Sequence, residues 1–232
     1  MIENRLDCLA LTETWLSAKE EENRAVLSNL VPSDFNIIHV PRVTRGGGVG
    51  FIYNSKFKAK LDISLKFTSF ECQTVLLDAS SFTFRFVIIY RIPPNSKNKI
   101  QKSTFIEELG DLLEATATLS GKLMLLGDFN VHLDNSSDPE GRQLTSLLAS
   151  FGMEQHVTDA THVDGHTLDL VVSRVTDEVV QCCKVGPFIS DHNSILISLK
   201  SGKHHAIRKQ TTFRKVKSID IQKFSKEIIL DF

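Results

Sequence analysis

The sequence predicts an α/β protein of the α+β type, a four-layer α/β/β/α sandwich of two packed, mainly antiparallel sheets with outer helices. Strand-length apolar runs recur along the chain, helical patterns are few, and neighbouring runs are separated by short turn segments. The chain has 232 residues, of which 41% are hydrophobic, so it can bury a sizeable core within one large domain.

The expected elements follow one another in a simple order. Strands are expected at 6–13, 35–40, 49–53, 58–65, 69–79, 82–90, 122–126, 168–172, 179–185 and 195–199. Helices are expected at 19–30, 104–119 and 138–151. The second helix has Phe105, Leu109 and Leu112 on one face. The third begins with an Asp138 cap and a Pro139 at its first position.

Charge is distributed unevenly along the chain. Residues 1–202 hold 19 Lys and Arg against 25 Asp and Glu, whereas residues 203–217 hold six Lys and Arg and no acid. We therefore expect a domain at 1–202 and a basic linker or tail at 203–232. Such a tail is suited to phosphate contacts with a nucleic acid. The alternative is a solvated linker that binds nothing.

The remaining composition points to a soluble intracellular protein, nuclear or cytoplasmic and not secreted. The cysteines show neither CxxC nor zinc spacing and are expected to be free thiols in a reducing compartment: Cys8, Cys72, Cys182 and Cys183. The first ten residues are too charged for a signal peptide, and no apolar run reaches membrane-spanning length. No membrane association and no obligate protein partner are expected.

Two polar clusters lie at the ends of predicted strands. Glu13 ends the first strand, where a carboxylate could bind a hard cation such as Mg²⁺, although an acid facing water is the alternative. Asp128 and Asn130 follow an apolar strand through Gly127 and would point the same way in extended backbone. This pair offers an acceptor for a water proton and a donor for a phosphate oxygen. An Asx-type turn is the structural alternative.

Three further positions could support chemistry at neutral pH. Asp191 and His192 precede the last strand, and His is suited to general acid–base work, although such pairs also occur by chance on surfaces. Asp169 interrupts an apolar strand and could orient His192, or it could be an acid at a strand edge. Tyr90 closes another strand, where its phenol could donate to a phosphate or simply pack at an interface.

Two suggestive patterns carry no site prediction. The glycine-rich segment 46–50 precedes a strand and lacks a following Lys-Ser/Thr, so it predicts a tight turn or a close backbone approach rather than a phosphate loop. The other histidines show no HExxH-like spacing, and we expect no zinc site among them. They are His39, His132, His156, His162, His166, His204 and His205.

Taken in order, these clusters resemble the endonuclease/exonuclease/phosphatase superfamily, and in detail the endonuclease domain of non-LTR (LINE-type) retrotransposons. The matching words are LALTETWL (9–16), RGGGVGFIY (45–53), VIIYRIPP (87–94), LLGDFNVHLD (125–134), HTLDLVVS (166–173) and SDHNSILISL (190–199). The resemblance covers roughly residues 6–200. The chain after residue 210 is similar to the linker that leads from that domain toward a reverse transcriptase.

The resemblance implies a metal-dependent endonuclease that nicks DNA, with Mg²⁺ as cofactor and Mn²⁺ as a substitute. It assigns Glu13 to metal binding and Asp191 to the metal side of the site. It assigns Tyr90 and Asn130 to contacts with the scissile phosphate and its transition state. Further phosphate contacts are implied for Thr161 and Ser190.

The same resemblance implies in-line attack of water on the phosphodiester. Asp128 would orient or deprotonate the water. Asp169 would orient His192, which would face the phosphate as a base or as a charged stabiliser.

One feature departs from the family pattern. The family opens with a strand that carries an Asn at the metal site, upstream of the Glu13 strand, and Asn4 is not in that context. We expect this strand to be absent, through a truncated gene copy or an incomplete gene start, which exposes a sheet edge. The alternatives to a nicking enzyme are therefore a catalytically impaired remnant that binds nucleic acid, or a phosphatase of the same superfamily.

Overall fold

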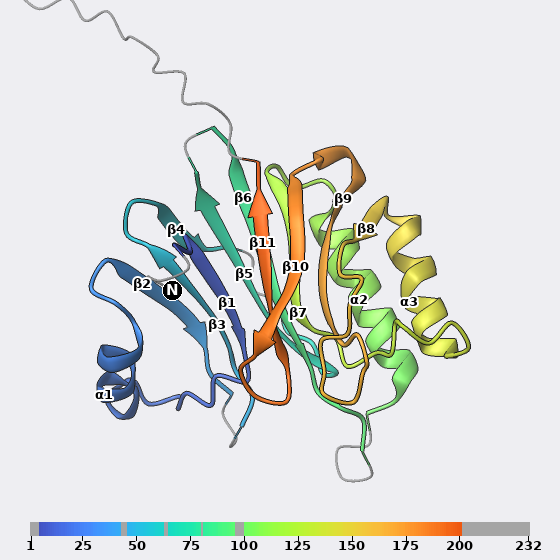
Figure 1. Cartoon of the computed structure of the whole chain (residues 1–232), viewed down its shortest axis with the longest axis horizontal. Coiled ribbons are helices and arrows are strands. Elements are labelled where there is room, and N and C mark those ends of the chain that lie inside the picture. The colour runs from blue at the N-terminus through green and yellow to red at the C-terminus, as the bar shows by residue number, and fades with distance from the viewer. Residues whose placement is uncertain (1–4, 43–45, 63–64, 80, 96–99, 201–232) are drawn as a thin grey trace, which may run out of the picture.

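The computed structural model describes residues 5–42, 46–62, 65–79, 81–95 and 100–200 (Figure 1). Asn4 and the predicted basic tail at 203–232 lie outside the described residues. No helix in the described part of the chain combines the length and apolar character needed to cross a bilayer.

A continuous six-stranded sheet forms the centre of the molecule, in the order β4-β5-β6-β7-β9-β8. Its strands are β4 (Lys58–Leu61), β5 (Phe70–Asp78), β6 (Thr83–Arg91), β7 (Lys122–Asp128), β8 (Met153–Gln155) and β9 (Asp169–Arg174). All neighbours are antiparallel except β6 and β7, which are parallel and joined through a helix. β6 is buried along nearly its whole length, as expected for a central strand rich in β-branched and aromatic residues.

A second β layer covers one face of this sheet and is divided into two parts. One part has the order β1-β3-β2, with β1 (Cys8–Thr12), β2 (Phe35–Val40) and β3 (Val49–Asn54). The other is the hairpin of β10 (Val180–Phe188) and β11 (Asn193–Leu199). In the described residues no strand joins β1 to β11, so each has one unpaired edge. The expectation that a strand is missing from this layer stays a prediction.

The helices cover the opposite face. α2 (Lys102–Ala117) and α3 (Pro139–Ser150) lie against the six-stranded sheet, while α1 (Glu20–Leu30) lies beside the β1-β3-β2 part (Figure 1). The amphipathic face predicted for the second helix is buried against β6 and β7. The Asp138 side chain accepts a hydrogen bond from the Glu140 N–H, as predicted for the cap of α3.

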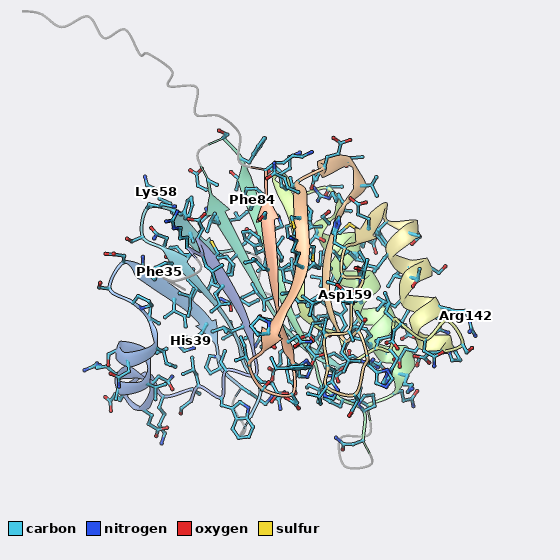
Figure 2. All side chains as sticks on the ribbon, in the orientation of Figure 1. Phe35, His39, Lys58, Phe84, Arg142 and Asp159 are labelled. Carbon is cyan, nitrogen blue, oxygen red and sulfur yellow. The ribbon has the colours of Figure 1, made fainter. Side chains whose placement is uncertain are left out.

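Successive side chains of β6 point alternately into two hydrophobic cores, one on each face of the sheet. Val87 and Ile89 face the helices, whereas Phe84, Phe86 and Ile88 face the second β layer. Side chains fill the space between the layers, where Phe84 is labelled (Figure 2). The two parts of the second layer contact the same core, so both belong to one sandwich.

The predicted sandwich and its outer helices are confirmed. Two elements were not predicted, β8 and a 3₁₀ helix at Val175–Asp177, because each has only three residues and shows no period. β4 ends at Leu61 rather than at residue 65, and β7 continues beyond the predicted end to Asp128.

Candidate active site

A row of polar residues crosses four neighbouring strands at one end of the six-stranded sheet. Tyr90 pairs with Glu71 on one side and with Asp128 on the other, and Asp128 pairs with Asp169. Residues that pair directly face the same side of a sheet. Tyr90 belongs to the core under the second β layer, so the row faces that layer. Strand register therefore brings together residues that are far apart in the sequence.

Gly127 makes the end of β7 possible. Its φ is +133°, and a Cβ built there would lie 2.0 Å from the Ile89 carbonyl oxygen of the neighbouring strand. A side chain would therefore push β6 and β7 apart directly before Asp128. Gly127 therefore allows a close approach of the two backbones that no other residue permits.

Asn130 holds Asp128 by two hydrogen bonds. Its backbone N–H donates to Asp128 Oδ1 at 2.9 Å, and its side-chain Nδ2 donates to Asp128 Oδ2 at 2.9 Å. Nδ2 also donates to the Arg91 carbonyl at 3.0 Å. Both hydrogens of the amide are thus engaged, so Asn130 positions Asp128 in this arrangement. Its contact with a phosphate stays a prediction and requires it to release one of these partners.

Arg91 holds the loop that contains Asn130 and was not identified from the sequence. Its fully buried guanidinium donates to the Asn130 carbonyl at 3.0 Å and pairs with Glu140 at the start of α3. It also lies over the Phe105 ring, 4.3 Å from its centroid. The only sequence signal was an arginine directly after the Tyr90 strand and an acid in the first turn of α3.

Asp169 and His192 form the pair that was predicted from the sequence. His192 Nδ1 lies 2.7 Å from Asp169 Oδ2, and both side chains are largely buried. The hydrogen bond from Nδ1 leaves Nε2 of the ring as the atom for other contacts. The β10–β11 connection thus places His192 beside the row on the six-stranded sheet.

The electrostatics of this group favour one protonation state for each member. The hydrogen bond to Asp169 raises the pKa of His192 to about 9, so its ring is an imidazolium at neutral pH. Burial, followed by the charge of Asp169, raises the pKa of Asp128 to about 7. Asp128 therefore exchanges a proton near neutrality, which is the range in which a general base is effective. His192 is suited to stabilising negative charge.

Glu13 reaches the same end of the molecule from β1. It has a left-handed backbone with φ of 50°, and so does Trp15 with φ of 55°, a conformation that is uncommon for residues other than glycine. Trp15 Nε1 donates to Glu13 Oε2 at 3.2 Å. Burial and then a hydrogen bond with Glu13 raise the pKa of the Tyr90 phenol. Glu13 and Tyr90 are therefore in contact.

The glycine-rich segment supports this arrangement through a close backbone approach, as predicted. Gly47 and Gly48 accept hydrogen bonds from Trp15 and Thr14 at 2.8 and 3.1 Å. A Cβ at Gly48 would lie 2.6 Å from the Thr14 hydroxyl, so only glycine allows this contact. These bonds fix the backbone directly after Glu13.

Glu71 joins the glycine segment to the polar row and was missed by the sequence reasoning. Its carboxylate accepts the Gly48 N–H at 2.6 Å and pairs with Arg42, whose guanidinium carbon lies 5.7 Å from the centre of the Tyr90 ring. Nothing in its local sequence distinguishes it from an acid on a strand surface. Only the pairing of β5 with β6 places it beside Tyr90.

The predicted residues Ser190 and Asp191 lie next to His192 with exposed side chains. The Ser190 hydroxyl accepts the His192 N–H at 3.2 Å, and a hydrogen bond with Ser190 lowers the pKa of Asp191. His162, not predicted for the site, is the additional neighbour. Its Nε2 lies 3.8 Å from Asp191 Oδ2, and its Nδ1 accepts the Asp164 N–H at 3.2 Å. An isolated β-bridge joins His162 to His192.

Thr161 positions the start of β9. Its buried Oγ1 accepts the N–H groups of Leu168 and Asp169, each at 3.0 Å. These bonds fix the backbone that presents Asp169. The phosphate contact implied for Thr161 stays a prediction.

The two predicted metal ligands are carboxylates at the same end of the molecule. Glu13 and Asp191 are exposed carboxylates, and Mg²⁺ prefers oxygen ligands and often takes only one or two from protein. Among the described residues, clusters of three possible ligands are His162–Asp191–His192 and His132–Asp134–His166. Glu13 belongs to neither, so the metal site expected from Glu13 and Asp191 stays a prediction.

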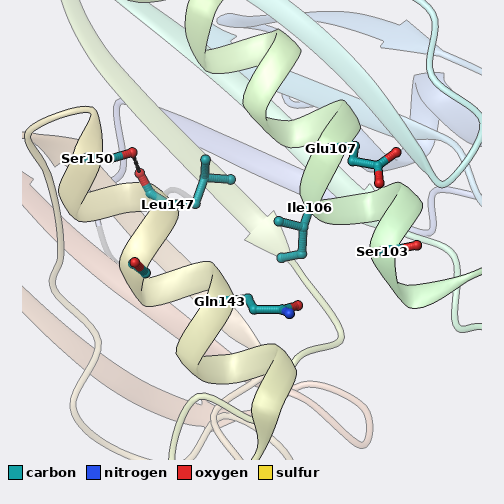
Figure 3. Close-up of a pocket in the computed structure, with 7 residues that line it drawn as sticks. Ser103, Ile106, Glu107, Gln143, Leu147 and Ser150 are labelled. Atoms are coloured by element: carbon teal, nitrogen blue, oxygen red, sulfur yellow. Dashed lines mark hydrogen bonds between the residues drawn. The ribbon is translucent and has the colours of Figure 1, made fainter.

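A groove between α2 and α3 lies away from these residues (Figure 3). It encloses about 400 Å³ and is lined by residues such as Ile106, Gln143 and Leu147. The helices cover the face of the sheet opposite to the polar row, and no predicted site residue lines the groove. It therefore takes no part in the candidate site.

Comparison with known proteins places the chain among nucleases and phosphatases. The model of the Endonuclease/Exonuclease/phosphatase family matches residues 1–192. No curated protein matches the chain.

Solved structures share the fold at low sequence identity. The 3′ phosphatase NExo from Neisseria, bound to a product DNA hairpin, is 16% identical with a TM-score of 0.63, covering 86% of this chain and 91% of that one. The endonuclease domain of TRAS1, a telomere-specific non-LTR retrotransposon, is 10% identical with a TM-score of 0.64, covering 86% and 88%. The human Nocturnin catalytic domain is 16% identical with a TM-score of 0.60, covering 86% and 83%.

Proposed function

We propose, from the premise that the chain belongs to the Endonuclease/Exonuclease/phosphatase family, that it hydrolyses phosphodiester bonds with a divalent metal and nicks DNA. The observation that carries this proposal is the convergence of Glu13, Tyr90, Asp128, Asp169 and His192 at one end of the sandwich. Mg²⁺ is the preferred cofactor and Mn²⁺ a substitute. The words TETWL and RGGGV favour a retrotransposon-type endonuclease, whose nick would prime reverse transcription.

The contacts of three residues support the roles proposed for them. Asp128, held by Asn130, accepts a proton from the attacking water, and its pKa of about 7 suits this step. The His192 imidazolium, held by Asp169, donates from Nε2 to a phosphate oxygen as negative charge develops. Tyr90 donates its phenolic hydrogen, which its raised pKa retains on the oxygen.

The metal would be held by Glu13 and Asp191. When bound, it neutralises charge that develops on the phosphate oxygens. Asn130, Thr161 and Ser190 complete the set of proposed phosphate contacts.

The decisive experiment is conversion of supercoiled plasmid to the nicked form by the full chain, with Mg²⁺ and with a chelator. We expect Asp128→Ala and His192→Ala to slow nicking by about 10²- to 10⁴-fold. Asp111→Asn is the matched control, because Asp111 is an exposed carboxylate on α2, on the far side of the sheet. If the wild-type chain nicks no faster than Asp128→Ala, the proposed activity is wrong for this chain.

Two rival functions give different outcomes. A catalytically impaired nucleic-acid-binding module is favoured by the divided second β layer, which lies next to Glu13. It predicts salt-sensitive DNA binding without nicking, lost from a chain that ends at residue 202. If the chain is a phosphatase, we expect it to hydrolyse inositol phosphates and to leave the plasmid intact.

A further inference from the structure

A second cluster of metal-ligating side chains lies apart from the residues assigned above. It consists of His132, Asp134 and His166, and one ligand atom of each lies within 4.8 Å of the others. His166 Nδ1 is 3.1 Å from Asp134 Oδ2. The rings of His132 and His166 are perpendicular, at 88°, with centroids 4.1 Å apart. The sequence reasoning set both histidines aside because they lie 34 residues apart and form no local zinc motif.

The backbone around the cluster is fixed independently of any ligand. The Thr167 N–H donates to Asp134 Oδ1 at 3.0 Å, which leaves Oδ2 directed at His166. The His166 carbonyl accepts the N–H groups of Thr161 and His162 at 2.9 and 3.0 Å. The His132 carbonyl accepts the Asn135 N–H at 3.3 Å. The three side chains therefore start from a fixed backbone, with their ligand atoms within 4.8 Å of one another.

The types of side chain in the cluster indicate which cation it would bind. Two imidazoles and one carboxylate are ligands that Zn²⁺ accepts, with water in the fourth position of a tetrahedron. Mg²⁺ and Ca²⁺ prefer oxygen ligands throughout, so they fit this cluster less well than Zn²⁺. His132 and Asp134 are exposed, which leaves access for the ion and for the water. The Thr167 N–H bond to Asp134 orients the carboxylate as a supporting contact in such a site.

We propose that His132, Asp134 and His166 form a Zn²⁺ site that fastens the loop after β7 to the turn before β9. The first segment leads from Asp128, and the second contains Thr161 and leads into Asp169. The ion would stabilise the arrangement of these two segments and take no part in hydrolysis. The proposal does not depend on the proposed function, because the site shares no residue with the proposed catalytic set.

The test is metal binding by the full chain without an affinity tag, measured with Co²⁺ and Zn²⁺. Co²⁺ reports its coordination through visible absorption bands, and Zn²⁺ should displace it and raise the unfolding temperature by several degrees. We expect His132→Ala and His166→Gln to weaken binding by about tenfold or more and to remove the thermal shift. Binding should also weaken as pH falls, since the imidazoles bind as neutral rings.

The matched control is His162→Ala, which removes a histidine from the cluster His162–Asp191–His192 and leaves the proposed site complete. Its Zn²⁺ affinity and thermal shift should equal those of the wild type. Because His132 is exposed, its replacement should leave the metal-free unfolding temperature unchanged, which separates loss of metal from loss of fold. The proposal is overturned if the wild type binds no Zn²⁺, or if the affinity survives unchanged in His132→Ala and His166→Gln.

Discussion

The two β layers of the sandwich differ in how firmly they hold the candidate site. The six-stranded sheet is continuous, its central strands β6 and β7 are mostly buried, and it supplies Tyr90, Asp128 and Asp169. The second layer is divided, β1 and β11 are only partly buried, and its segments supply Glu13 and His192. The proposed proton acceptor, Asp128, therefore lies on the more deeply buried layer. The proposed cation ligands lie on segments of the less buried one.

Replacing two arginines should give the largest difference in unfolding free energy between the two layers. Arg91→Ala leaves the buried Glu140 carboxylate with only the exposed Lys102, 3.4 Å away, as a cationic partner, and we expect it to lower the free energy of unfolding by about 3–5 kcal/mol. Arg42→Ala breaks the partly exposed pair with Glu71 and should cost about 1 kcal/mol. Urea unfolding measures both values. Equal losses would mean that the two layers contribute alike.

A pair of aliphatic residues gives the next largest contrast. Leu125→Ala removes a fully buried side chain from β7 and should cost about 2–5 kcal/mol. Ile197→Ala removes a partly buried side chain from β11, and we expect about 1 kcal/mol. The same unfolding assay compares them. A larger loss for Ile197→Ala would contradict the difference between the two layers.

The buried carboxylate predicts a pH effect on stability. The pKa of Asp128 is about 7 in the folded chain, against about 3.9 in an unfolded one, so the folded state favours the protonated form. Its stabilising effect is complete below pH 4 and is lost as pH rises through 7. Asp128→Asn should therefore lose less stability than the wild type between pH 5 and 8, by about 2–3 kcal/mol. Identical pH profiles would contradict the raised pKa.

The pH dependence of nicking gives the finest test. Activity should rise as Asp128 ionises near pH 7 and fall as His192 loses its proton near pH 9. Asp169 raises the pKa of both groups, so Asp169→Asn should move both limbs of the profile toward acid, by about one pH unit or more. Movement of one limb alone would show that Asp169 supports only one of the two residues.

The sequence predicted most of what depends on local pattern. Ten strands and all three helices follow from apolar periodicity, and the Asp169–His192 pair follows from an acid embedded in an apolar strand. Glu71 and His162 were missed because their neighbourhood exists only once strands are in register. Arg91 was missed because a buried ion pair leaves no signal when its partner lies 49 residues away.

The close approach at Gly127 has a consequence for comparing related sequences. Since a Cβ at this position would collide with the Ile89 carbonyl, any other residue there separates the two parallel strands that carry Tyr90 and Asp128. A copy of the gene that retains every acid and histidine but has lost this glycine should still be counted as decayed. The residue at position 127 therefore indicates, from a related sequence alone, whether Tyr90 and Asp128 can keep this arrangement.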